Sequence, residues 1–234
     1  MRLIALICLG LLAGCVVPTE EQAPVNAGSA VSASPLVAPS TAARQFVSVV
    51  RTLEPVAERV CRQQAPGMNC DFQIVVDDRP GQPPNAFQTL DKSGRPVVAF
   101  TLALIAEARN QDELAFVMGH EAAHHIAGHI ARQQQNAAAG AVIFAGLATL
   151  TGADAGGVRA AQDIGAAVGA RSYSKDFELE ADALGTVITK TAGYDPVHGA
   201  EFFTRIPDPG NRFLGTHPPN AARIETVRRV AAGM

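Results

Sequence analysis

The sequence predicts an α+β fold that is mainly helical, in which a small antiparallel sheet is followed by a set of helices. Alternating segments typical of strands occur between residues 72 and 100, and apolar residues at helical spacing dominate most of the rest. Hydrophobic residues make up 47% of the 234 residues. This proportion is enough for a hydrophobic core, and the length fits one domain with extensions.

The N-terminal segment is interpreted as a targeting signal. Arg2 precedes an apolar run over residues 3–13, which is too short to span a bilayer permanently. The run ends in LAGC (residues 12–15), which resembles a bacterial lipobox, so Cys15 is expected to become the lipid-modified first residue. The alternative is an ordinary secretory signal in which Cys15 is incidental. Val16 favours sorting to the outer membrane, with the protein lipid-anchored and facing the periplasm.

The predicted domain organisation has three parts. Residues 1–14 form a lipoprotein signal peptide, residues 15–40 a flexible tether rich in Pro, Ala and Ser, and residues 41–234 the folded domain. The formal net charge is −3, and the few Lys and scattered Arg form no basic stripe. Nucleic acid is therefore not expected as a partner.

Two cysteines remain after the signal and the lipid-attachment residue are set aside. Cys61 and Cys70 are close in sequence, and an oxidising compartment favours a disulfide between them. Free thiols and metal ligands are the alternatives, although the spacing is not that of a zinc knuckle.

The first half of the domain is predicted to contain one helix, three strands and another short helix. Apolar residues at helical spacing begin after Thr41 and reach Val60, and Pro55 is expected to kink or split that helix. The predicted strands cover residues 72–76, 85–90 and 96–100, with a tight turn at 91–94. A short helix at 102–108 leads into the segment that carries the chemistry.

That segment is HEAAH (residues 120–124), inside a predicted helix capped by Asn110, with Glu113 placed to close a capping box. No Pro interrupts residues 112–135. Positions i and i+4 share one face of a helix, so the two imidazoles can bind one metal ion. Glu121 faces the open side of the metal, where it can take a proton from a bound water. A chance match to a short motif is the alternative.

A catalytic zinc needs three protein ligands and an open position, and His120 and His124 supply two. The best candidate for the third is Glu178. Asp182 lies on the same helix face and can accept a hydrogen bond from the non-ligating nitrogen of a zinc-bound His, whereas Glu180 points away. The alternative for Glu178 is a solvated surface acid.

The second half of the domain reads as further helices. Two Ala- and Gly-rich segments are expected to pack over the domain, either as a hairpin near the mouth of the site or as plain core helices; the first is short of the ~20 residues that a membrane span needs. A later helix ends at Gly193, and Asp195-Pro196 begins another. The predicted ranges are 137–150, 155–170, 177–191 and a final amphipathic helix near 222–230.

Two further histidines, His125 and His129, are not expected to bind the same metal ion. His125 is turned away from its ligand neighbour on the helix. His129 is nine residues from His120, hence on the opposite side of the same helix, and is interpreted as structural. His198 is expected at the surface.

These motifs together resemble the HtpX and CAAX-prenyl-protease type of zinc metallopeptidases, within the gluzincins. The resemblance covers roughly residues 70–230. It rests on NAF (85–87), on ELAFVMGHEAAHHIAGH, on Tyr173-Ser174 through FELEAD, and on THPP (216–219) with Arg223.

The resemblance implies a zincin-like domain and a set of site residues. The implied ligands of one Zn²⁺ per chain are His120, His124 and Glu178. The implied catalytic residues are Glu121 as base and His217 near the reacting carbonyl, with Arg223 as support for His217. Asp182 is implied to support a metal-bound histidine. Asn85 is implied to head an edge strand that binds the substrate.

The soluble envelope lipoproteins of this family look most similar, which predicts a zinc-dependent endopeptidase that hydrolyses misfolded or stalled envelope proteins. Unfolded or misassembled envelope proteins and the outer-membrane assembly machinery are the expected partners, and the N-terminal lipid is the expected membrane contact. Strong transmembrane spans are lacking, so prenylated substrates are not expected.

Two other functions compete with this prediction. One is a latent zinc-containing chaperone or assembly factor with little proteolysis, in which His217 closes the site as a fourth ligand. The other, a purely structural zinc site, is disfavoured because such sites prefer Cys-rich shells and have no use for Glu121.

Overall fold

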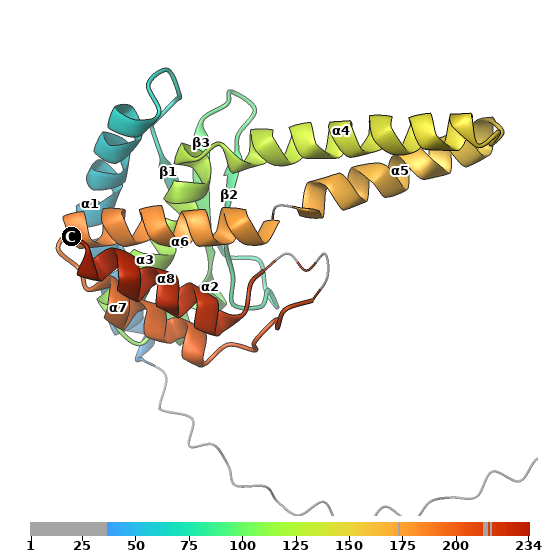
Figure 1. Ribbon diagram of the computed structural model, residues 1–234. Coiled ribbons are helices and arrows are strands. Elements are labelled where there is room, and N and C mark those ends of the chain that lie inside the picture. The colour runs from blue at the N-terminus through green and yellow to red at the C-terminus, as the bar shows by residue number, and fades with distance from the viewer. Residues whose placement is uncertain (1–36, 173, 213–214, 216) are drawn as a thin grey trace, which may run out of the picture. The chain divides into compact units, whose positions relative to one another are not determined.

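The computed structural model describes residues 37–172, 174–212, 215 and 217–234. The signal peptide, Cys15 and most of the tether lie outside these residues, and their assignments remain predictions. The fold is mainly helical with one small sheet, as predicted (Figure 1). The elements are α1 (Pro39–Gln64), β1 (Gln73–Asp77), β2 (Ala86–Leu90), β3 (Pro96–Thr101), α2 (Leu102–Glu107), α3 (Gln111–Ile126), α4 (His129–Leu150), α5 (Ala155–Ser172), α6 (Ser174–Thr191), α7 (Pro196–Gly199), the 3₁₀ helix η1 (Ala200–Thr204) and α8 (Asn220–Ala232).

The sheet is mixed, which corrects the prediction of an antiparallel sheet. β2 and β3 pair antiparallel across the predicted turn, with Phe87 opposite Ala99. The strand order is β1-β3-β2, and β1 pairs parallel with β3. The chain therefore passes from β1 to the far edge before it returns through the centre, so β1 and β3 run in the same direction. β2 is left as an edge strand of this sheet.

α1 is one helix through Pro55 and is not split, contrary to one of the two expected outcomes. Pro55 lies on the exposed side, where water can bind the carbonyl that loses its partner. The opposite side, which includes Val49 and Leu53, is buried. On this side the ring of Phe46 packs edge-to-face against the ring of Phe100 in β3, with the ring centroids 5.1 Å apart. Burial of this side outweighs the local cost of the proline.

α3 begins as predicted, because the side chain of Asn110 accepts a hydrogen bond from the backbone of Glu113. The carboxylate of Glu113 accepts from the backbone of Arg109 rather than Asn110, one residue from the expected capping box. The helix ends at Ile126, not near residue 135, because Gly128 adopts a left-handed conformation with φ +65°. α4 then starts in a new direction.

α3 and α6 approach so closely that their backbones meet at glycines. A Cβ atom on Gly185 would lie 2.8 Å from the backbone nitrogen of His120, and one on Gly119 would lie 2.9 Å from the carbonyl oxygen of Gly185. Only glycine permits this approach. It places the N-terminal half of α6 directly across from the HEAAH motif.

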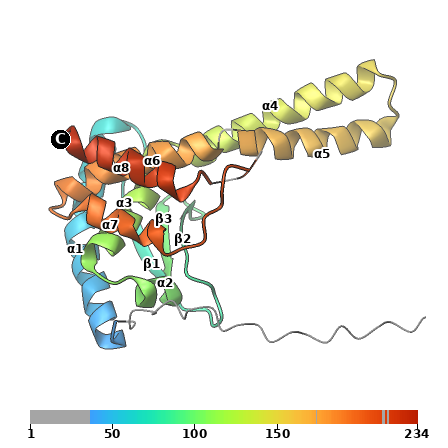
Figure 2. The ribbon, with the colours of Figure 1, turned by 60° about the horizontal axis from the view of Figure 1, so that its bottom comes forward.

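α4 and α5 form a hairpin and lie side by side in both views (Figures 1 and 2). The prediction that these Ala/Gly-rich segments pack over the domain is wrong, because the two helices pack mainly against each other and project away from the rest of the fold. The contact is again made by glycines, since a Cβ atom on Gly140 would strike the carbonyl of Gly165. The main contacts of the hairpin with other elements are those of α4 with α3 and of α5 with α6.

The hairpin buries little of its surface. His129 is the buried residue of α4 and Gly165 that of α5. Large apolar side chains are exposed along α4, up to 85% for Leu150 and 71% for Val142. Among the described residues, no helix has the length and apolar character needed to cross a bilayer.

Candidate active site

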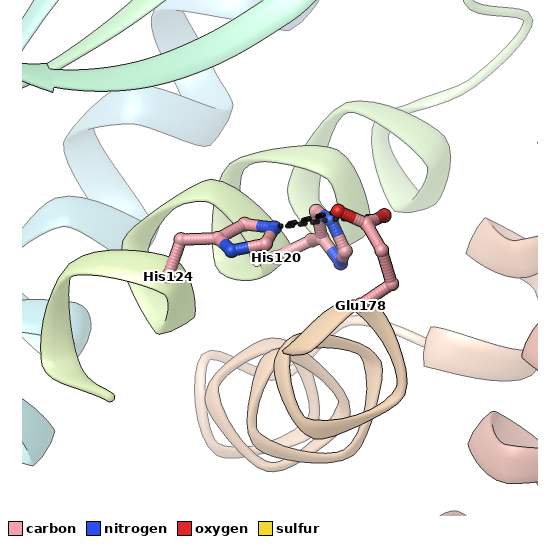
Figure 3. Close-up of side chains that lie close together, drawn as sticks. All are labelled: His120, His124 and Glu178. Atoms are coloured by element: carbon pink, nitrogen blue, oxygen red, sulfur yellow. Dashed lines mark hydrogen bonds and ion pairs between the residues drawn. The ribbon is translucent and has the colours of Figure 1, made fainter. Parts of the chain in front are cut away.

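Three side chains from two helices converge at one point. His120 and His124 stand one turn apart on α3, and Glu178 reaches across from α6 (Figure 3). The Nε2 atoms of the two histidines are 3.0 Å apart, and the Glu178 carboxylate oxygens lie 3.6 Å from His120 Nε2 and 3.4 Å from His124 Nε2. One possible ligand atom from each of the three residues falls within 4.8 Å of the others.

The chemistry of this donor set fits Zn²⁺. Two neutral imidazole nitrogens and one carboxylate oxygen are the ligands of a catalytic zinc that keeps an open position, and a Cys-rich closed shell is the pattern of structural sites. The structure thus brings together the three residues that the sequence suggested as ligands. It also leaves Glu121 on the wall of the adjoining cavity rather than in the cluster.

His120 is held from behind by a buried pair. Asp182, with no exposed surface, lies 2.9 Å from His120 Nδ1, and Arg223 of α8 donates two hydrogen bonds to the Asp182 carboxylate at 2.7 and 2.8 Å. The guanidinium packs 3.9 Å from the ring of Phe203. The predicted supporting role of Asp182 is geometrically feasible, because Asp182 can fix the ring orientation of His120. Arg223, which was predicted to support His217, keeps Asp182 in place.

The electrostatics keep the acids of this cluster ionised. Burial raises the pKa of Glu178, but its hydrogen bond with His124 and the electrostatic effect of the nearby His120 and Arg223 side chains bring the pKa well below its ordinary value. Burial likewise opposes ionisation of Asp182, and the hydrogen bonds from Arg223 outweigh it, so its pKa is also lowered. A pocket that contains ionised carboxylates and the lone pairs of imidazole nitrogens suits a cation.

A cavity of about 550 Å³ opens beside the cluster. It is bounded by the edge strand β2 together with the residue that precedes it, Asn85, and by Glu121 and His217. Asn85 is exposed and anchored through its backbone, whose nitrogen donates to Thr101 Oγ1 at 3.0 Å. The residues predicted for catalysis and substrate binding therefore share one cavity with the proposed ligands. Its apolar lining includes Leu104, Phe116, Val117, Phe202, Phe203 and Ile206.

Other predicted residues lie away from the cluster. Cys61 and Cys70 are joined by a disulfide between the end of α1 and the segment before β1. His125 faces away from the cluster, with Nε2 2.7 Å from the carbonyl of Asn69. His198 is 45% exposed and pairs with Asp112 at 2.8 Å. The position of His125 agrees with the expectation that it does not bind the metal, and the exposure of His198 agrees with its predicted place at the surface.

Sequence reasoning missed two residues near the site. The prediction for His129, on the opposite side of one long helix, is wrong, because His129 lies 2.8 Å from His124. Glu180 lies outside the ligand cluster, as predicted, but its contact with His129 at 3.2 Å was not foreseen. The turn at Gly128 redirects the chain, and a Gly two residues after the end of an apolar pattern is the signal that indicates such a turn. Burial lowers the pKa of His129 to about 4, so its ring is neutral at neutral pH.

Arg205, which lines the cavity, belongs to an ion pair that the sequence did not suggest. Arg205, at the end of η1, makes two hydrogen bonds of 2.6 and 2.7 Å to Glu113, which is 1% exposed. The pair attaches the segment after η1 to the first turn of α3. No local pattern marks it, because 92 residues separate its partners.

Comparison with known proteins places these features in a family. A model of peptidase family M48 matches residues 43–231. The chain is 30% identical over 154 residues to the beta-barrel assembly-enhancing protease of Escherichia coli strain K12, covering 56% of this chain and 30% of that protein. It is 30% identical over 180 residues to the mitochondrial metalloendopeptidase OMA1 of Saccharomyces cerevisiae, covering 70% of this chain and 47% of that protein.

A beta-barrel assembly-enhancing protease of Yersinia pestis is also 30% identical, over 154 residues, with the same coverage of 56% and 30%. The matched region thus spans from less than a third to about half of the length of these relatives.

Proposed function

The chain belongs to peptidase family M48, and from this membership we propose that it is a zinc-dependent endopeptidase acting on proteins of the bacterial cell envelope. The observation that carries the proposal is the convergence of His120, His124 and Glu178 beside a cavity that also contains Glu121. A protein that only binds peptides would need neither the ligand cluster nor the carboxylate of Glu121 beside it.

The residues of the cavity have complementary parts in peptide hydrolysis. Bound zinc supplies a Lewis acid that polarises the scissile carbonyl and acidifies water. Glu121 accepts the proton of the attacking water and returns it to the leaving amine. His217 donates a hydrogen bond to the developing oxyanion. An extended peptide adds to the exposed edge of β2 through main-chain hydrogen bonds, next to Asn85.

The substrates proposed are unfolded or misassembled envelope proteins, with the outer-membrane assembly machinery as a partner. Two relatives are named beta-barrel assembly-enhancing proteases, which supports this class. The predicted signal at residues 1–14, lipid on Cys15 and tether over residues 15–40 would hold the domain of residues 41–234 at the periplasmic face of the outer membrane. Nucleic acid has no part in the proposal.

A second function has one observation in its favour. His217 lines the same cavity as the ligand cluster, so a movement of this side chain onto the metal would give a latent protein that assists assembly without much proteolysis. The test below separates the two.

Zinc content and cleavage of casein by the purified full chain should be compared with those of Glu121→Gln. The substitution keeps the shape and removes the base, so we expect one zinc in both proteins and a loss of about 10²- to 10⁴-fold in the cleavage rate of the variant. Zinc in both proteins with cleavage by neither would favour the latent protein, and His217→Ala should then release activity. Absence of zinc from both would overturn the assignment of the site.

A further inference from the structure

The ring of His124 has two nitrogens with different surroundings. Nε2 faces the proposed metal position, 3.0 Å from Nε2 of His120 and 3.4 Å from Glu178. Nδ1 faces the other way, 2.8 Å from Nδ1 of His129. His120 has Asp182 and Arg223 behind it, whereas His124 has His129.

His129 reaches this position because the chain turns between α3 and α4. Gly128 takes φ +65°, and His129 is the first residue of α4. The ring is 5% exposed and stacks on Phe177 of α6, with centroids 4.6 Å apart and planes at 12°. Its orientation is therefore fixed by packing from a second helix.

The far nitrogen of His129 is also engaged. Nε2 lies 3.2 Å from a carboxylate oxygen of Glu180, and the same oxygen accepts a hydrogen bond from Arg132 at 2.7 Å. Arg132 also packs over the ring of Phe177, with its guanidinium carbon 4.3 Å from the ring centroid. Four side chains from α4 and α6 thus form one connected unit behind His124.

With both rings neutral, as metal binding requires of His124, the contacts in this unit allow one arrangement of donors and acceptors. A carboxylate can only accept, so Nε2 of His129 carries the proton that faces Glu180. Nδ1 of His129 then carries no proton and accepts a hydrogen bond from Nδ1 of His124. This leaves the lone pair of His124 on Nε2, the atom that faces the ligand cluster.

We propose that His129, oriented by Glu180, is a positioning residue that sets the tautomer and ring orientation of His124 for metal binding. The inference rests on the proposed zinc site. Each histidine ligand then has its own support, an acid–arginine pair for His120 and a histidine–acid–arginine chain for His124.

The test measures the affinity of the full chain for Zn²⁺ by competition with a chromogenic chelator. His129→Phe keeps a stacked ring but removes the acceptor, and we expect its affinity for zinc to fall by about 10- to 100-fold. His129→Asn places an amide oxygen near the position of Nδ1 and should restore much of the loss. With zinc in excess, kcat for casein should be lower in His129→Phe while KM is unchanged.

His125→Phe is the matched control, because His125 is a neighbouring histidine of similar burial, 6%, that faces Asn69 and not the cluster. It should bind zinc like the wild type even if it lowers stability. Glu180→Ala provides a variant at a residue whose side chain is 47% exposed, so it should fold, with a several-fold loss of affinity.

The outcomes separate the two proposals. Wild-type zinc affinity in both His129→Phe and Glu180→Ala would overturn the positioning role and leave the zinc site intact. A loss equal in His125→Phe and His129→Phe would also overturn it, since it would show a general effect of packing. If the wild type itself binds no zinc, the proposed function fails first.

Discussion

Two pairs of helices in this chain meet through glycine backbones, and they differ in what surrounds them. α3 and α6 meet at Gly119 and Gly185, with α1, the sheet and α8 packed around them. α4 and α5 meet at Gly140 and Gly165 and bury little else. The close approach of α3 and α6 therefore fixes the positions of the ligand cluster, whereas that of α4 and α5 only holds the two helices of the hairpin together.

The difference shows that close helix contact does not by itself create a precise site. At α3 and α6, the contact occurs at the backbone of His120, so any change in helix separation moves Glu178 and Asp182 relative to it. The hairpin contains no member of the ligand cluster. We therefore expect substitutions of equivalent glycines to have unequal consequences.

The largest effect is expected from Gly185→Ala. The new methyl group would lie 2.8 Å from the nitrogen and 2.9 Å from Cα of His120, both backbone atoms that cannot rotate away. The free energy of unfolding should fall by about 3 kcal/mol, and the affinity for zinc should fall more than tenfold. Urea denaturation and zinc titration measure the two effects.

Gly146→Ala is the control for that substitution, because Gly146 lies within α4 with no atom within 4 Å of an added Cβ. A gain of about 0.5–1 kcal/mol is expected from its higher helix propensity. Wild-type zinc affinity in Gly185→Ala would mean that the glycine contact does not determine the geometry of the cluster.

A smaller effect on the site is expected from Gly165→Leu, which breaks the other pair. Its side chain would strike the carbonyl of Gly140 and lie 2.7 Å from Cβ of Phe144, so α4 and α5 must separate. We expect less helical circular dichroism and faster proteolysis between residues 137 and 170, with zinc affinity within about twofold of the wild type. A loss of zinc comparable to that of Gly185→Ala would remove the distinction between the two pairs.

The smallest effect is expected from the substitution His198→Asn, at the surface of the region around α3 and α6. The hydrogen bond to Asp112 raises the pKa of His198 above its ordinary value of 6.5, and it ties α7 to the first turn of α3. Because the folded pKa is the higher one, the stabilisation is complete below 6.5 and is lost as the pH rises through the raised pKa. Urea denaturation of the wild type and His198→Asn should converge as the pH rises from about 6 to about 8; parallel curves would contradict the contact.

The sequence was most informative where function depends on spacing along one helix. Two histidines four residues apart must share a face, so the cluster on α3 could be predicted, and Glu178 with Asp182 follows by the same rule on α6. Asn110 and Gly193 mark helix ends because their local chemistry is specific to those positions.

What could not be predicted depends on contacts between distant segments. Strand order is absent from local periodicity, so the parallel pairing of β1 with β3 was missed. The helix through Pro55 survives because its opposite face is buried, which the proline itself does not indicate. His129 was misplaced because one left-handed glycine, Gly128, changes the direction of everything after it.

The hairpin also decouples chain length from the geometry of the site. α4 begins where α3 ends, and α5 ends where α6 begins, so the 47 residues that separate Ile126 from Ser174 need not be closed as a flexible loop (174 − 126 − 1 = 47). Contacts between adjacent segments form early and shorten the effective loop, which lowers the entropy cost of joining α3 to α6. Helical turns could be added to or removed from both α4 and α5 without moving the ligands on α3 or the ligand on α6. The hairpin is thus a place where such a chain can gain or lose exposed surface at little cost to its chemistry.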